Sequence, residues 1–83
     1  MASLLRVVSD PTRLQLLSLI QHSPDEHVRV ADLARALDLR QPTVTHHLNV
    51  LDEAGIVVRE RHGREVWCQI VPERIEEIAD LLR

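Results

Sequence analysis

Side chains that can hydrogen-bond to nucleic-acid bases gather on one side of a predicted helix in the middle of this sequence. The helix is expected over residues 41–54. Its apolar stripe recurs at helical spacing and consists of Val44, Leu48 and Leu51. Thr45, His46 and Asn49 fall on the opposite side, and their short polar groups can reach base edges in the major groove of DNA. The pattern favours a helix that reads DNA sequence over an ordinary polar helix surface, which is the alternative.

The start of this helix offers further contacts to DNA. Arg40, Gln41 and Thr43 lie at or beside its first turn, where side chains and backbone N–H groups can contact phosphate. We expect these three residues to belong to the DNA-binding surface. His47 lies between two apolar positions on the helical wheel, so we expect it to be half-buried and structural.

A basic hairpin is predicted after the helix. Gly55 ends the helix, as a glycine directly after the last periodic residue often does. Near the hairpin tip stand Arg61, His62 and Arg64, for which we expect contacts to phosphate or to the minor groove. In the alternative, the tip is only solvated and its arginines pair with neighbouring glutamates, Glu60 and Glu65.

The two strands of the hairpin are expected at about residues 56–61 and 65–70, with Gly63 at the turn. In the second strand Val66, Cys68 and Ile70 alternate onto one face, whereas Trp67 and Gln69 take the other. We therefore interpret Cys68 as an inert core residue. A redox-sensing role, through modification or an intersubunit bond, is the less favoured reading.

The remaining chain predicts four more helices. They are expected over residues 2–8, from Pro11 to about Gln21, over residues 30–37, and from Pro72 onward. Asp10 can cap the second helix, and Pro11 suits its first turn. We expect Leu14, Leu17 and Ile20 to face inward. The order α-α-α-α-β-β-α predicts a mainly α fold with a β-hairpin, a winged helix-turn-helix, as one domain over residues 1–83.

Length and composition agree with a small DNA-binding domain. The 83 residues contain neither Phe nor Tyr, so the core must be aliphatic and an oligomer would bury further apolar surface. The formal net charge is −3, yet residues 28–64 carry six arginines against five carboxylates. No membrane span or signal peptide is expected. The single cysteine suits a reducing cytosol, so we expect a cytoplasmic protein.

Residue types that bind metals occur in one loop. His22, Asp25, Glu26 and His27 form the only such cluster, and a polar loop between helices is the favoured interpretation. The acidic face at residues 73–80 is interpreted as a solvated helix surface. No catalytic set or phosphate-cradling glycine loop stands out, so we expect neither an enzyme nor a cofactor.

Four segments resemble one family of bacterial repressors. They are Ser9-Asp-Pro-Thr-Arg-Leu14, Leu33-Ala-x-Ala-Leu37, Gln41-Pro-Thr-Val-Thr-His-His-Leu48 and Leu51-x-x-Ala-Gly-Ile-Val57. Together they resemble the ArsR/SmtB family over residues 9–70. The resemblance implies a homodimeric repressor that releases an operator when it senses a metal ion or another signal. It also implies that the first and last helices form the dimer. The apolar positions there are Leu4, Leu5, Val8, Ile75, Ile78 and Leu82.

The sequence departs from the family at its sensor sites. The common Cys-Val-Cys-Asp-Leu motif corresponds here to Arg29-Val-Ala-Asp-Leu33, which has no thiolate. The other common site begins with an Asp-x-His pair in the last helix, where this chain has Pro72 and Arg74. Neither metal site can form, so we expect no bound metal, and the inducer stays unknown. Asp38 replaces the usual turn glycine and tolerates the left-handed conformation.

Two functions follow as hypotheses. The first is a homodimeric repressor that binds double-stranded DNA at an inverted-repeat operator. The second is a winged-helix module for protein–protein assembly that does not bind DNA, which the acidic overall charge favours slightly.

Overall fold

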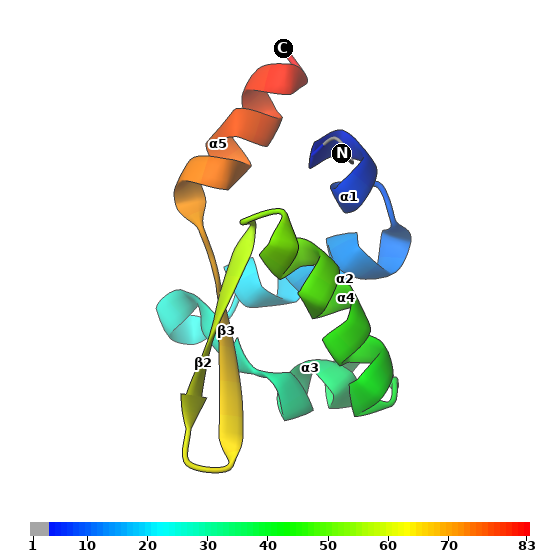
Figure 1. Cartoon of the computed structure of the whole chain (residues 1–83), viewed down its shortest axis with the longest axis vertical. Helices are drawn as coiled ribbons and strands as arrows, with labels where there is room; N and C mark the ends of the chain where they lie inside the picture. The colour runs from blue at the N-terminus through cyan, green and yellow to red at the C-terminus, as the bar shows by residue number, and fades with distance from the viewer. Residues whose placement is uncertain (1–3) are drawn as a thin grey trace.

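The computed structural model describes residues 4–83 and has the winged helix-turn-helix architecture predicted from the sequence (Figure 1). In chain order the elements are α1 (Leu4–Val8), α2 (Pro11–Gln21), the 3₁₀ turn η1 (Pro24–Glu26), β1 (His27–Arg29), α3 (Val30–Leu37), α4 (Gln41–Glu53), β2 (Val57–His62), β3 (Glu65–Ile70) and α5 (Pro72–Leu81). The helix boundaries agree with the prediction to within about one residue. Residues 2 and 3 of the predicted first helix lie outside the described residues.

One strand was not predicted. Residues 22–27 were expected to form a loop, but His27–Arg29 forms strand β1, which makes a three-stranded antiparallel sheet in the order β1-β3-β2. Val28 lies opposite Cys68, and Arg29 lies opposite Trp67. A strand of three residues is too short to show an alternating pattern, and its pairing depends on β3, which comes some forty residues later. The sheet therefore joins the hairpin to the start of α3.

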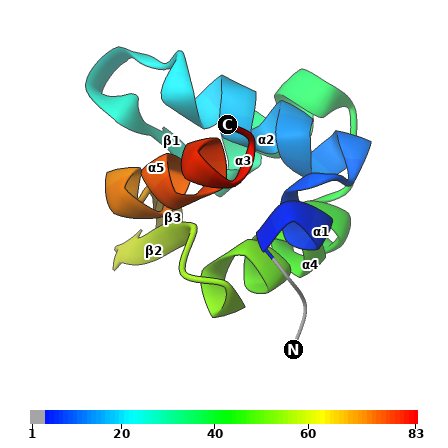
Figure 2. The same ribbon diagram turned by 90° about the horizontal axis from the view of Figure 1, so that it is seen from above.

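The molecule is elongated, measuring 38 × 23 × 21 Å, and its two ends differ in structure. Figure 1 shows α3, the first turn of α4 and the tip of the β2–β3 hairpin in the lower half. Helices α1 and α5 lie at the opposite end, where they contact each other (Figures 1 and 2). We call these regions the α4–wing end and the α1–α5 end.

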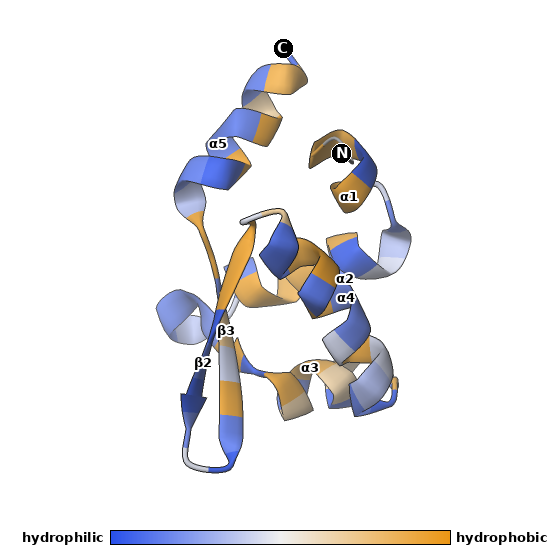
Figure 3. Cartoon of the chain, viewed as in Figure 1, coloured by the Kyte–Doolittle hydropathy of each residue, from blue (hydrophilic) through white to orange (hydrophobic). Residues whose placement is uncertain are grey.

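An aliphatic core fills the space between the two ends. Its fully buried side chains come from α2, α3, α4, the turn after α4, and both hairpin strands: Leu16, Ile20, Leu33, Val44, Leu48, Leu51, Ile56, Val57 and Cys68. The hydropathy colouring shows apolar stretches on the helices and on the upper part of the hairpin, and hydrophilic residues at the hairpin tip (Figure 3). The three buried residues of α4 are those of the predicted stripe, so the opposite side of this helix is free to face a partner.

The start of α2 follows the prediction, but one of its core positions does not. The Asp10 carboxylate accepts hydrogen bonds from the N–H groups of Thr12 at 2.9 Å and Arg13 at 3.1 Å. These bonds, chiefly the one from Arg13, lower the pKa of Asp10. The prediction for Leu14 was wrong, because this side chain is 50% exposed and Leu16 is buried instead. At 3.6 residues per turn, Leu14 lies about 110° from the middle of the buried face.

Two residues with positive φ end the helices of the helix-turn-helix. Asp38 follows α3 with φ 53° and ψ 46°, and the next N–H, that of Leu39, donates to the Ala34 carbonyl at 2.9 Å. Gly55 follows α4 with φ 74°, and the next N–H, that of Ile56, donates to the Leu51 carbonyl at 2.9 Å. Both turns satisfy carbonyls that a helix C-terminus leaves unpaired. They set the directions in which α4 and β2 leave the core.

Candidate nucleic-acid interface

Helix α4 presents a polar surface to solvent. Thr45, His46 and Asn49 are all exposed, whereas the apolar stripe on the other side is completely buried. His47 is half-buried, as expected, and its ring centroid lies 5.7 Å from that of His46. The residues that could reach base edges thus share one side of a helix whose other side is fixed in the core. Such a surface can enter the major groove without rearrangement.

The first turn of α4 is also open. Arg40 precedes the helix with extended backbone angles, φ −73° and ψ 146°, and its carbonyl accepts from the Thr43 and Val44 N–H groups. The Arg40 side chain does not cap the helix. Arg40, Gln41 and Thr43 are all exposed. The N-terminus of this helix, where the helix dipole favours negative charge, therefore carries a free cation and two uncharged polar side chains.

The β2–β3 hairpin is the wing of this fold, and its tip brings the three basic residues predicted to contact DNA close together. Arg61, His62 and Arg64 are exposed around Gly63, whose φ of 64° closes the turn. His62 Nε2 lies 3.6 Å from Glu60 Oε2. In the alternative interpretation Glu60 and Glu65 would pair with the tip arginines, but Glu60 lies beside His62 and Glu65 is bonded outside the hairpin, as described below.

The arginines at the α4–wing end divide into those that form an ion pair and those that form none. Among residues 4–83, those without an ion pair are Arg40, Arg61 and Arg64. Arg59, closer to the core, donates from Nε to Asp52 Oδ2 at 3.2 Å and so ties β2 to the end of α4. The three free guanidinium groups belong to the predicted DNA-binding set. A cation that keeps its hydrogen-bond donors unused can neutralise phosphate without first losing a partner.

A groove of about 220 Å³ lies between α4 and the wing. It is lined by residues of β1, α3, α4 and the β2–β3 hairpin with its turn: Arg29, Val30, Ala31, Gln41, Thr45, Arg59, Arg64, Glu65 and Val66. Three of the predicted contact residues, Gln41, Thr45 and Arg64, therefore share one concave surface. The groove separates the start of α4 from the wing.

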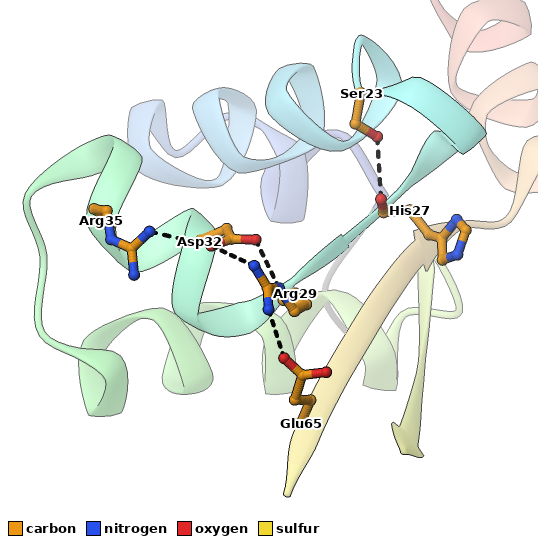
Figure 4. Close-up of polar contacts among 6 residues, drawn as sticks. All are labelled: Ser23, His27, Arg29, Asp32, Arg35 and Glu65. Carbon is orange, nitrogen blue, oxygen red and sulfur yellow. Dashed lines mark hydrogen bonds and ion pairs between the residues drawn. The ribbon is translucent and has the colours of Figure 1, made fainter. Parts of the chain in front are cut away.

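Sequence reasoning missed an arginine that connects the wing to α3. Arg29 donates from Nη1 to Glu65 Oε2 at 2.6 Å and from Nε to Asp32 Oδ2 at 2.9 Å (Figure 4). Its guanidinium carbon lies 5.8 Å from the centroid of the Trp67 ring. The hydrogen bond to Glu65 and, after it, the hydrogen bond to Asp32 raise the pKa of Arg29. The i,i+3 spacing of Arg29 and Asp32 was a visible signal for one contact, but nothing in the sequence indicated Glu65.

The residues weighed as metal ligands or redox groups lie apart. His22 bonds through Nδ1 to the Ser18 carbonyl at 2.8 Å, and His27 bonds to the Asp25 carbonyl and packs on Trp67. No group of three or more such ligands occurs within residues 4–83. Cys68 is buried in the core, and burial raises the pKa of its thiol to about 11. At neutral pH roughly one thiol in 10⁴ would be ionised, which disfavours the redox reading.

The residues predicted to form a dimer differ in exposure. Leu82 is 71% exposed and Leu5 is 37% exposed, while Leu4 and Ile75 are half-buried. Val8 and Ile78 are each only 9% exposed, so the chain itself already covers them. Leu81, which was not predicted, is 57% exposed. The α1–α5 end therefore leaves apolar surface uncovered, mainly on leucines. In the part of the chain that the structure describes, no helix has the length and apolar character needed to cross a membrane.

Comparisons with known proteins agree with this architecture. The sequence profile of the bacterial regulatory protein, arsR family, matches residues 10–58. An uncharacterized HTH-type transcriptional regulator of Methanocaldococcus jannaschii is 36% identical over 81 residues, which cover 98% of this chain and 89% of that protein. The HTH-type transcriptional repressor SmtB of Mycobacterium tuberculosis is 35% identical over 75 residues, or 90% of this chain, but the match spans only 53% of the repressor's length.

A solved structure described as a possible transcriptional regulator for arsenical resistance superposes with a TM-score of 0.90 at 27% identity. The alignment covers 99% of this chain and 82% of that one. The chain belongs to the ArsR family of bacterial regulatory proteins. It is a DNA-binding transcriptional regulator of the helix-turn-helix class and not an enzyme.

Proposed function

We propose that this protein is a homodimeric, sequence-specific repressor that binds inverted-repeat DNA through α4 and the wing. The observation that carries the proposal is the grouping of three unpaired arginines with the polar side of α4 at one end of the molecule. Thr45, His46 and Asn49 would contact base edges. Arg61, His62 and Arg64 on the wing, with Arg40, Gln41 and Thr43 at the helix start, would contact the backbone. The repressor named among its relatives supports the direction of control.

The dimer is proposed from the opposite end of the chain. Leu5, Leu81 and Leu82 expose apolar surface there, and a second copy of the same surface would cover it around a two-fold axis. Two copies related in this way would present two α4 helices to two half-sites of an inverted repeat. We place this complex in the cytoplasm, together with the DNA that it would bind.

Binding to a labelled inverted-repeat duplex during a salt titration tests the proposal. A suitable duplex can be selected from random sequence with the protein itself. We expect tight binding to the selected duplex, weaker binding to a scrambled duplex, and a steep loss of both as salt rises. Affinity that is equal for both duplexes, or that does not change with salt, would contradict the proposed function.

We further propose that release from DNA does not use the two common metal sites of the family. Arg29 and Ala31 stand at the thiolate positions of one site, and Pro72 and Arg74 stand at the first ligand positions of the other. None of these side chains is a Zn(II) ligand in proteins. Equilibrium dialysis with Zn(II) and As(III) should find no tight site. One tightly bound ion per subunit would contradict this and would direct attention to His22 and His27.

A further inference from the structure

A negative charge lies beside the surface that is proposed to meet DNA phosphate. Glu65 is the first residue of β3, directly after Arg64, and it lines the groove between α4 and the wing. Its side chain is about half exposed. An unpaired carboxylate at this place would repel phosphate and would also attract the adjacent Arg64. Either effect would weaken a wing whose function depends on free positive charge.

Arg29, which lies outside the hairpin, forms an ion pair with the Glu65 carboxylate. The Nη1–Oε2 distance of 2.6 Å is the shortest of the ion pairs between described residues. The Asp32 carboxylate accepts two hydrogen bonds from the other side of the guanidinium, from Arg29 Nε at 2.9 Å and from Arg29 Nη2 at 3.4 Å. Arg35 also reaches Asp32, at 3.5 Å, so the charges alternate from α3 to the wing (Figure 4). The planar fork of an arginine can serve two carboxylates in this way, whereas a lysine has only one charged nitrogen.

The position of the Arg29 backbone determines the direction of its side chain. Its backbone pairs with Trp67 in the sheet, and the same residue begins the turn into α3. Arg29 is thus held by the sheet, while Arg64 lies in the turn at the hairpin tip. Glu65 is bonded to Arg29, and Arg64 has no ion pair among the described residues.

We propose that Arg29 is a positioning residue for DNA binding, which masks the Glu65 carboxylate and so leaves the wing arginines free for phosphate. This inference rests on the proposed function, because it requires that the wing contacts DNA. It assigns Arg29 an electrostatic role in binding without direct contact to DNA. Exposed ion pairs contribute little to folding stability, so the effect should be seen in DNA affinity and not in unfolding.

The test compares Arg29→Ala, Glu65→Gln and the double variant on selected and scrambled duplexes by fluorescence anisotropy. Arg29→Ala should weaken binding to both duplexes by roughly fivefold to tenfold at low salt, because each subunit then exposes an unmasked carboxylate. Glu65→Gln should bind at least as tightly as the unaltered protein. The double variant should lie within about twofold of Glu65→Gln, because the Glu65 carboxylate is gone and Asp32 keeps its ion pair with Arg35.

Arg74→Ala is the matched control. Arg74 is also a partly exposed arginine, with 42% side-chain exposure like Arg29, and it donates to Glu77 at 2.8 Å on α5. Its removal changes the net charge equally but at the α1–α5 end, and we expect DNA affinity to change by less than about twofold. Thermal unfolding of every variant shows whether the fold has been preserved.

Three results would overturn the inference. If Glu65→Gln weakened binding as much as Arg29→Ala, the ion pair would act only as a mechanical link. If the double variant stayed weak and its salt slope were lower by about one contact per subunit, Arg29 would contact phosphate itself. If Arg29→Ala bound DNA as tightly as the unaltered protein, the Glu65 carboxylate would not weaken DNA binding and would need no masking. A failure of the proposed function looks different, because the unaltered protein would then show no salt-dependent binding.

Discussion

The α4–wing end and the α1–α5 end each leave something uncovered, but the chemistry differs. At the α4–wing end the uncovered groups are charged and polar, and the neighbouring carboxylates are bonded away from Arg61 and Arg64. At the α1–α5 end they are leucine side chains, among acidic residues of α5. In the proposed complex DNA would offer phosphate to the first surface, and a second copy of the chain would offer apolar surface to the other. A small domain can therefore keep two interfaces apart by placing them at opposite ends of one core.

The largest expected effect comes from adding charge at the α1–α5 end. Leu81→Asp combined with Leu82→Asp should shift the protein to a monomer of about 9.5 kDa and reduce operator affinity by roughly 100-fold or more, because a monomer meets one half-site only. Light scattering at micromolar protein measures the mass, and anisotropy measures the affinity.

Val58→Asp is the control for that pair, since Val58 is 49% exposed on strand β2 and belongs to neither α1 nor α5. It should remain dimeric. Ile78→Asp is less informative, because Ile78 is buried by its own chain and its loss would unfold the subunit. If the unaltered protein were already monomeric at micromolar concentration, the dimer proposed at the α1–α5 end would be contradicted.

The core between the two ends should respond to alkaline pH. Burial raises the pKa of the Cys68 thiol from 9.0 to about 11, so between these values the unfolded chain loses a proton that the folded chain keeps. The free energy of unfolding should therefore fall as pH rises through this window, by roughly 2–3 kcal/mol in total. The chain has neither tyrosine nor lysine to titrate in the same range.

Urea unfolding followed by Trp67 fluorescence at several pH values between 8 and 11 measures this decrease. Cys68→Ala serves as the control. Its stability should be lower at pH 8 but nearly independent of pH above it. An equal slope in both proteins would show that the thiol is not the group responsible.

The α4 surface should control specificity. His46→Ala or Thr45→Ala should cost roughly 1–3 kcal/mol on the selected operator and much less on scrambled DNA, because base-edge contacts carry the discrimination. Anisotropy on both duplexes gives the ratio of affinities. If His46→Ala lowered both affinities equally, α4 would not read bases, and its polar side would need another explanation.

The smallest effect is expected from single wing arginines. Arg61→Ala or Arg64→Ala should weaken binding to both duplexes by a similar factor and reduce the salt slope by about one contact per subunit. The ratio between selected and scrambled DNA should stay nearly constant. Comparison with the α4 variants then separates two functions within the same end: the helix changes specificity, and the wing changes salt dependence.

Local patterns predicted most of the fold, and long-range contacts account for what they missed. The buried stripe of α4, the Asp10 cap and the two glycine turns each depend on residues within a few positions, so the sequence showed them directly. Strand β1 and the Arg29–Glu65 bond join residues 36 or more positions apart. No local period encodes such pairs. Leu14 was placed wrongly because three leucines within four residues cannot all face one side of a helix.

The two glycines differ in what surrounds them, and this has a consequence for sequence drift. A methyl group at Gly63 would meet no atom within 4 Å, so only its φ of +64° restricts the position. Asp38 already occupies the same backbone region in this chain, so Asn or Asp should persist at position 63 in a library of functional variants. Gly55 has two restrictions: its φ is +74°, and a Cβ there would lie 3.0 Å from Arg74 Nε. Under selection, position 55 should stay glycine while position 63 diversifies.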